Sequence, residues 1–112
     1  MSPDKSKVHP VPVMRAPRKF GHNMRDARRR RRIPSSVLAE RAGIGRMTLI
    51  RIERGDGSVS MAGYAAALYS LGMIEPLGDI ADPRFDAIGR EIEEEHLPQR
   101  IRLRRPKPKD DR

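Results

Sequence analysis

The chain has 112 residues and a formal net charge of +9, with 37% hydrophobic residues and no cysteine. This length suits one small domain with tails, and the lack of cysteine excludes disulfide bonds, thiolate metal sites and a cysteine nucleophile. No apolar run approaches the roughly 20 residues that a membrane helix needs, and the N-terminus lacks the apolar segment of a signal peptide. We therefore expect a soluble, cytoplasmic protein that makes no membrane contact.

The charge is distributed unevenly along the chain. Residues 15–54 contain 13 basic and 3 acidic side chains, whereas residues 55–99 contain 2 basic and 9 acidic ones. A merely soluble cationic surface explains the total charge but not this segregation. The basic half therefore predicts a surface that binds the phosphates of a nucleic acid.

Residues 1–18 are rich in proline and lack apolar periodicity, so we expect a disordered arm. A helix should follow from about Gly21 to Arg32, and its apolar face comprises Phe20, Met24, Ala27 and the aliphatic stem of Arg31. The helix ends in a run of five arginines, which alone is also typical of a targeting or RNA-binding tract. At this position we expect DNA phosphate contacts from Arg29, Arg30, Arg31 and Arg32.

Two short amphipathic helices separated by a glycine turn come next. The first has an apolar repeat at helical spacing, formed by Leu38, Ala39 and Ala42. Gly43 then stops the helix, since glycine readily takes the positive φ of a helix C-cap. A second apolar pair, Leu49 and Ile52, begins six residues later. This pattern predicts a helix-turn-helix.

The second of these helices, at about Arg46–Glu53, has two different faces. One is apolar, and the other combines arginine, apolar and hydroxyl side chains, namely Arg46, Met47, Thr48, Ile50 and Arg51. A solvated helix rarely exposes methionine and isoleucine beside two arginines. In a DNA major groove these groups have partners, because arginine binds guanine edges and apolar groups contact thymine methyls. We predict that these five residues read bases. Ser35 or Ser36 should cap the preceding helix, where Ser35 would bind a phosphate.

The segment LAERAGIGRMTLIRIERG resembles the core of the lambda-repressor-like helix-turn-helix family, also called the Cro/C1 or XRE family. The resemblance rests on Ala39, Gly43, Thr48, Leu49, Ile52, Glu53 and Gly55. It covers about residues 20–73 and implies an all-α bundle of about five helices that binds DNA as a homodimer. In that family an arginine of the first helix commonly pairs with the glutamate that ends the recognition helix. The resemblance thus implies a structural pair between Arg28 and Glu53.

The DNA-binding domain should extend over residues 19–81. Ser60 is expected to cap a helix at Met61–Leu71 that Gly72 terminates, and a short helix should follow at about residues 74–80. Tyr64 lies on the apolar face of the first of these helices. At that spacing we interpret it as a core residue, with base stacking as the alternative.

Residues 82–104 should form an extension that makes dimer or partner contacts, followed by a flexible basic tail at 105–112. Asp82 and Pro83 are expected to start a helix through about His96 with an apolar stripe of Phe85, Ile88 and Ile92. The run QRIRLR alternates polar with apolar residues. This alternation predicts a short strand that pairs with a second chain through Ile101 and Leu103.

A longer resemblance, which includes ADPRFDAIG and LPQRIR, links the chain to HipB-like antitoxins that accompany HipA-type kinase toxins. It implies a repressor of a palindromic operator that autoregulates a toxin–antitoxin operon and contacts the kinase. The alternatives are a phage- or plasmid-type repressor without a kinase partner, and an accessory subunit that uses the fold for protein contacts alone. No Ser-His-Asp, P-loop, dinucleotide or metal-ligand pattern occurs, so we expect neither an enzyme nor a cofactor.

Overall fold

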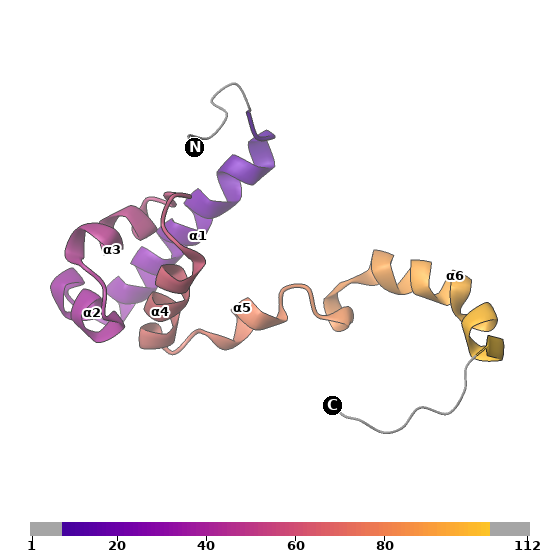
Figure 1. The fold of residues 1–112 in the computed structure, drawn as a ribbon. Helices are drawn as coiled ribbons and strands as arrows, with labels where there is room; N and C mark the ends of the chain where they lie inside the picture. Colours follow the sequence, from indigo (N-terminus) through magenta and orange to yellow (C-terminus); the bar gives the residue numbers. More distant parts are fainter. Residues whose placement is uncertain (1–7, 104–112) are drawn as a thin grey trace. The chain divides into compact units, whose positions relative to one another are not determined.

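The computed structural model describes the backbone of residues 8–103 and the side chains of residues 8–96. The fold is all-α, as predicted (Figure 1). Its elements are α1 (Val11–Arg30), α2 (Ser35–Ala42), α3 (Arg46–Glu53), α4 (Met61–Leu71), α5 (Glu75–Asp79), the 3-10 turn η1 (Pro83–Phe85) and α6 (Ala87–Leu103). The chain divides into two compact units after Leu77. Within the described part of the chain, no helix combines the length and apolar character needed to cross a membrane.

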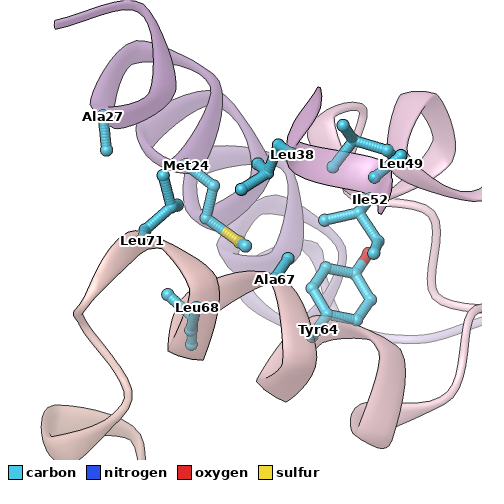
Figure 2. Packing of buried hydrophobic residues seen from close by; sticks show 10 residues of the cluster. Met24, Ala27, Leu38, Leu49, Ile52, Tyr64, Ala67, Leu68 and Leu71 are labelled. Carbon is cyan, nitrogen blue, oxygen red and sulfur yellow. The ribbon is translucent and has the colours of Figure 1, made fainter. Parts of the chain in front are cut away.

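The core of the first unit is built by α1, α2, α3 and α4 (Figure 2). Its buried side chains are Met24, Ala27, Leu38, Ala39, Leu49, Ile52, Tyr64, Ala67, Leu68 and Leu71. The three alanines let neighbouring helices approach closely, and the larger side chains fill the space between them. Met24, Ala27, Leu38, Ala39, Leu49, Ile52 and Tyr64 were predicted on apolar faces, and they are buried as expected. Phe20 and Ala42 are only half-buried, and Arg31, which was placed on the apolar face of the first helix, is exposed.

Tyr64 belongs to this core, as predicted. Its ring stacks on Phe20 with 5.6 Å between the ring centroids. Its hydroxyl donates a hydrogen bond of 2.7 Å to the carbonyl of Asp56, so the polar end of the buried ring has a partner. Burial raises the pKa of Tyr64 above its ordinary value.

The helix ends predicted at Gly43, Ser60 and Gly72 are confirmed. Gly43 has φ +69°, its amide donates to the Glu40 carbonyl, and the amide of Ile44 donates to that of Ala39. These two bonds satisfy carbonyls that the end of α2 would otherwise leave unpaired. Ser60 caps α4 by accepting a 3.1 Å hydrogen bond from the amide of Gly63.

Helix α1 begins earlier than expected, and the prediction of a disordered arm is wrong for residues 11–18. Pro12 lies in the first turn, where the missing N–H needs no partner. Pro17 lies inside the helix and removes one backbone hydrogen bond, which disfavours a helix. The backbone of Pro17 and Arg18 packs against Gly55, however, and this tertiary contact overrides the local signal. Residues 1–7 lie outside the described residues.

The second unit also differs from expectation. The prediction of a strand at Gln99–Leu103 is wrong, because these residues continue α6. Arginine and leucine are good helix formers, and an alternation this short does not distinguish a strand from a helix. Asp82 caps a helical turn that begins at Pro83, as predicted, by accepting a 2.8 Å hydrogen bond from the amide of Arg84. This turn is the short 3-10 element η1, however, and α6 begins only at Ala87. The side chains of Ile101 and Leu103, and the tail at 105–112, lie outside the described part.

The backbones of α1 and the end of α3 are in direct contact. A Cβ atom on Gly21 would lie 2.7 Å from the amide nitrogen of Gly55 and 2.9 Å from the carbonyl carbon of Glu53, closer than real Cβ atoms approach. Gly55 has φ +75° and would clash in the same way with the backbone of Arg18. Glycine is therefore required on both sides of this contact.

We predict that Gly21→Ala lowers the free energy of unfolding by about 1–3 kcal/mol, because the added methyl group meets backbone that cannot move aside cheaply. Urea denaturation measures this change. The control is Gly57→Ala, since a Cβ at Gly57 would meet no atom within 4 Å. Equal stability of the two variants would show that α1 and α3 are not in close contact in solution.

Candidate nucleic-acid interface

The helices α2 and α3 are joined by a turn of three residues, Gly43–Gly45. Leu49, Ile52 and Glu53 form the inner face of α3 and are buried. Ile44 in the turn is partly buried against the core. Since its inner face is packed in this way, α3 presents its remaining residues outward.

The outward face of α3 contains all five residues that were predicted to read bases. Arg46, Met47 and Arg51 are exposed, whereas Thr48 and Ile50 are half-buried. Met47 is 66% exposed, a large apolar side chain in water between neighbouring arginines. The face thus combines guanidinium donors with apolar contact groups, the two kinds of group that recognise base edges in a major groove.

The carboxylate of Asp56, to which the sequence analysis assigned no role, lies near the end of this face. Asp56 accepts hydrogen bonds from the amide and the hydroxyl of Ser58, and these bonds lower the pKa of Asp56. Its carboxylate lies 3.9 Å from the guanidinium of Arg51. Asp56 therefore partly neutralises the positive charge of Arg51. Within the described residues, the charge of Arg46, in the N-terminal half of α3 beside Met47, is not neutralised in this way.

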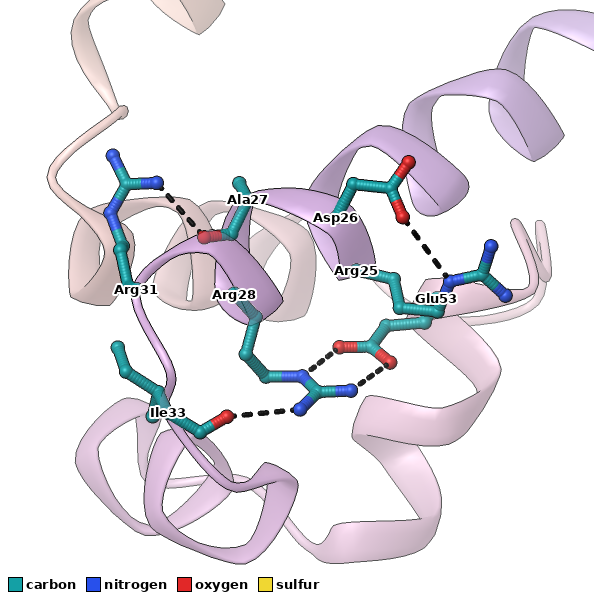
Figure 3. Close-up of polar contacts among 7 residues, drawn as sticks. All are labelled: Arg25, Asp26, Ala27, Arg28, Arg31, Ile33 and Glu53. Carbon is teal, nitrogen blue, oxygen red and sulfur yellow. Dashed lines mark hydrogen bonds and ion pairs between the residues drawn. The ribbon is translucent and has the colours of Figure 1, made fainter.

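The arginine run at the C-terminal end of α1 does not act as one group. Arg29, Arg30 and Arg32 are exposed. The guanidinium of Arg31 donates a 3.0 Å hydrogen bond to the carbonyl of Ala27, so it satisfies the end of its own helix (Figure 3). Arg32 has a left-handed φ of +55°, which a residue other than glycine adopts only at a cost in energy.

Ser35 does not cap α2, and the expectation of a capping hydroxyl from Ser35 or Ser36 is wrong. The N-cap is Pro34, whose carbonyl accepts hydrogen bonds from the amides of Val37 and Leu38. Ser35 is instead the first residue of the helix and is half-buried. The first amides of a helix have no partner within it, so this end of α2 retains donors that suit an anion.

The predicted pair between Arg28 and Glu53 is confirmed (Figure 3). The guanidinium donates two hydrogen bonds to the carboxylate, at 2.7 and 3.0 Å, and a third of 2.9 Å to the carbonyl of Ile33. The two side chains are only 12% and 10% exposed. The bonds to Glu53 raise the pKa of Arg28 further above its already high ordinary value. Through this pair, α1 holds both the loop before α2 and the C-terminal end of α3.

The three described residues predicted to contact a partner are exposed on the second unit. Phe85, Ile88 and Ile92 have exposures of 66%, 73% and 53%. The guanidinium of Arg84 lies 5.3 Å from the centre of the Phe85 ring. Glu91 and Glu93–Glu95 are exposed on the same helix. This segment is therefore apolar and acidic, in contrast to the surface of α3.

The candidate interface consists of the outer face of α3, the start of α2 and three exposed arginines at the end of α1, namely Arg29, Arg30 and Arg32. These elements belong to one packed unit, and the Arg28–Glu53 pair connects them. No protein-family model, no curated protein and no solved structure matches the chain.

We predict that Glu53→Gln lowers the free energy of unfolding by about 3–5 kcal/mol, since it leaves the Arg28 charge buried without its counter-charge. For a domain of this size the melting temperature should fall by more than about 10 °C. Thermal melts followed by circular dichroism measure the shift.

The matched control is Glu40→Gln, because Glu40 is an exposed glutamate on the neighbouring helix α2. Its melting temperature should stay close to that of the parent, as exposed charges contribute little. A Glu53→Gln variant that melts within a degree of the parent would contradict the structural role of the pair.

Proposed function

We propose that this chain is a sequence-specific, double-stranded DNA-binding repressor whose helix α3 enters the major groove. The observation that carries the proposal is the exposed set of Arg46, Met47 and Arg51 on a short helix whose inner face is locked into the core. An eight-residue helix is about 12 Å long, and a helix with its side chains is about 10–12 Å wide, which matches a major groove about 12 Å wide.

In this arrangement the residues of the interface have separate roles. Arg46 and Arg51 donate to base acceptors such as those of guanine, Met47 and Ile50 contact thymine methyl groups, and Thr48 offers a hydroxyl. Phosphate contacts come from Arg29, Arg30 and Arg32 and from the start of α2 at Ser35. Arg31 was also predicted to bind phosphate, but its hydrogen bond to Ala27 favours a role in ending α1.

We further propose that the protein acts as a homodimer on a palindromic operator, and that its second unit makes protein contacts. The acidic residues of α6 are repelled by phosphates, so this helix suits a protein better than DNA. Ile88 and Ile92 of α6 and Phe85 of η1 are exposed and give such a partner an apolar surface. The resemblance to HipB-like antitoxins makes a HipA-type kinase toxin the partner to test beside a second copy.

Substitutions in the two groups of arginines should have different effects on DNA binding. Arg46→Ala and Arg51→Ala should each relax the preference at particular base pairs, with about 1–3 kcal/mol of discrimination lost. Arg29→Ala should weaken binding to all DNA sequences alike. It should also reduce the salt dependence of binding by the amount expected for about one phosphate contact. Selection from a random duplex library, followed by affinity measurements on the selected sites, separates these outcomes.

Variants that lose affinity without any change in base preference would refute the assignment of α3 to base reading. A parent protein that selects no sequence from the library would refute the proposed function itself.

The apolar surface of α6 is tested by Ile88→Gln combined with Ile92→Gln. Both side chains are exposed in the single chain, so the fold should be unaffected while dimer formation, capture of a co-expressed HipA-type kinase, or both are lost. Sedimentation and co-purification measure these properties. The control is Ile80→Gln, because Ile80 is 70% exposed and lies outside α6. If the double variant assembled as the parent does, α6 would not form part of the interface.

A further inference from the structure

Basic side chains recur along the whole of α1 at intervals of three and four residues. They are Arg15, Arg18, His22, Arg25 and Arg29. Residues at these intervals lie on one face of a helix, so together they form a continuous line, here called the α1 basic stripe. All of its members are exposed except Arg25, which is half-buried. The stripe exists as one surface only because α1 begins at Val11.

The stripe runs past the end of α3. Gly21 is the residue of α1 that contacts the backbone of Glu53 and Gly55. Arg18 and Arg25 lie three residues before and four residues after Gly21, so they are its neighbours on the same side of the helix. The Cα atom of Arg18 itself faces Gly55. The stripe therefore flanks the helix that we assign to base reading.

The positive charge of this surface is little compensated. Helix α1 contains seven arginines and lysines and one acid, Asp26, whose carboxylate lies 3.7 Å from the Nε atom of Arg25. That Nε atom is buried and has no hydrogen-bond partner among the described residues. Within residues 8–96, no carboxylate lies within ion-pair distance of Arg15, Arg18 or Arg29.

The contact between the helices adds to this concentration of charge. Arg54 is exposed and precedes Gly55, which touches the backbone of Arg18. Cations of α1 and of the α3 end are thus held near one another by a backbone contact that cannot open without disrupting the fold. Like charges repel, and a polyanion that bridges them removes the repulsion.

We propose that the α1 basic stripe binds the sugar–phosphate backbone of duplex DNA beside the groove that α3 enters, an inference that rests on the proposed function. From Arg15 to Arg29 the stripe is about 21 Å long, at 1.5 Å of helix rise per residue. One DNA strand carries a phosphate about every 3.4 Å along the helix axis, so the stripe can contact several phosphates. Such contacts add affinity and fix orientation but carry no sequence information.

The test compares full-length variants in binding to a random-sequence duplex of about 30 base pairs over a range of salt concentrations, since non-specific binding depends on phosphate contacts. The test variant combines Arg15→Gln with Arg18→Gln. Glutamine is a good helix former and both arginines are exposed, so the melting temperature should not change. The control combines Arg90→Gln with Lys107→Gln, which removes the same formal charge outside the α1 basic stripe and the face of α3.

The test variant should lose affinity on the order of tenfold, and its salt slope should fall by about 1.8, the value for two phosphate contacts. The control should bind like the parent. If the test variant kept the affinity and salt slope of the parent while Arg29→Ala weakened binding, the proposed role of the stripe would be wrong but the proposed function would stand. An equal loss of affinity in the control would show that binding responds to net charge alone, and it would also overturn the proposed role of the stripe. A parent chain that binds no duplex would overturn both proposals.

Discussion

The contact between α1 and the C-terminal end of α3 is the constraint on which the rest of the first unit depends. A helix of eight residues is not stable alone, because its few hydrogen bonds do not offset the cost of ordering its backbone. Helix α3 buries Leu49 and Ile52, and its last turn is held by the pair of Glu53 with Arg28. The glycine contact brings the two backbones together beside this pair. The orientation of the exposed face of α3 therefore follows from α1.

Much of this arrangement could be predicted from the sequence, because its determinants are local. Gly43 ends a helix through its own backbone freedom, and Ser60 caps one through a residue three positions away. The outer face of α3 follows from helical periodicity once Leu49 and Ile52 are assigned to the core. The Arg28–Glu53 pair spans 25 residues and has no local signal, so its prediction depended on the family resemblance.

The features that sequence reasoning missed depend on contacts between distant residues, or on patterns too short to interpret. Pro17 indicated an irregular arm, but its backbone packs against Gly55, far along the chain. Pro34 replaced Ser35 as the cap of α2, because an extended proline already provides the carbonyl that starts the helix. At Gln99–Leu103 the alternation covers too few residues to distinguish a period of 2 from one of 3.6. The basic stripe of α1 was missed for a related reason, since its first members fell in the segment that was expected to be disordered.

The position of Pro17 also divides α1 into two parts of unequal stability. Residues 11–16 are all exposed, and the proline interrupts the hydrogen bonds that would couple their turns to the rest of the helix. Segments with few buried contacts open at a small fraction of the global unfolding free energy. The turns that carry Arg15 are thus a separate, weakly cooperative element, whereas Arg18 to Arg29 share the stability of the core. A ligand that binds along the entire helix would then have to order its first turns, which costs conformational entropy. The rest of the helix incurs no such cost on binding, because folding has already ordered it.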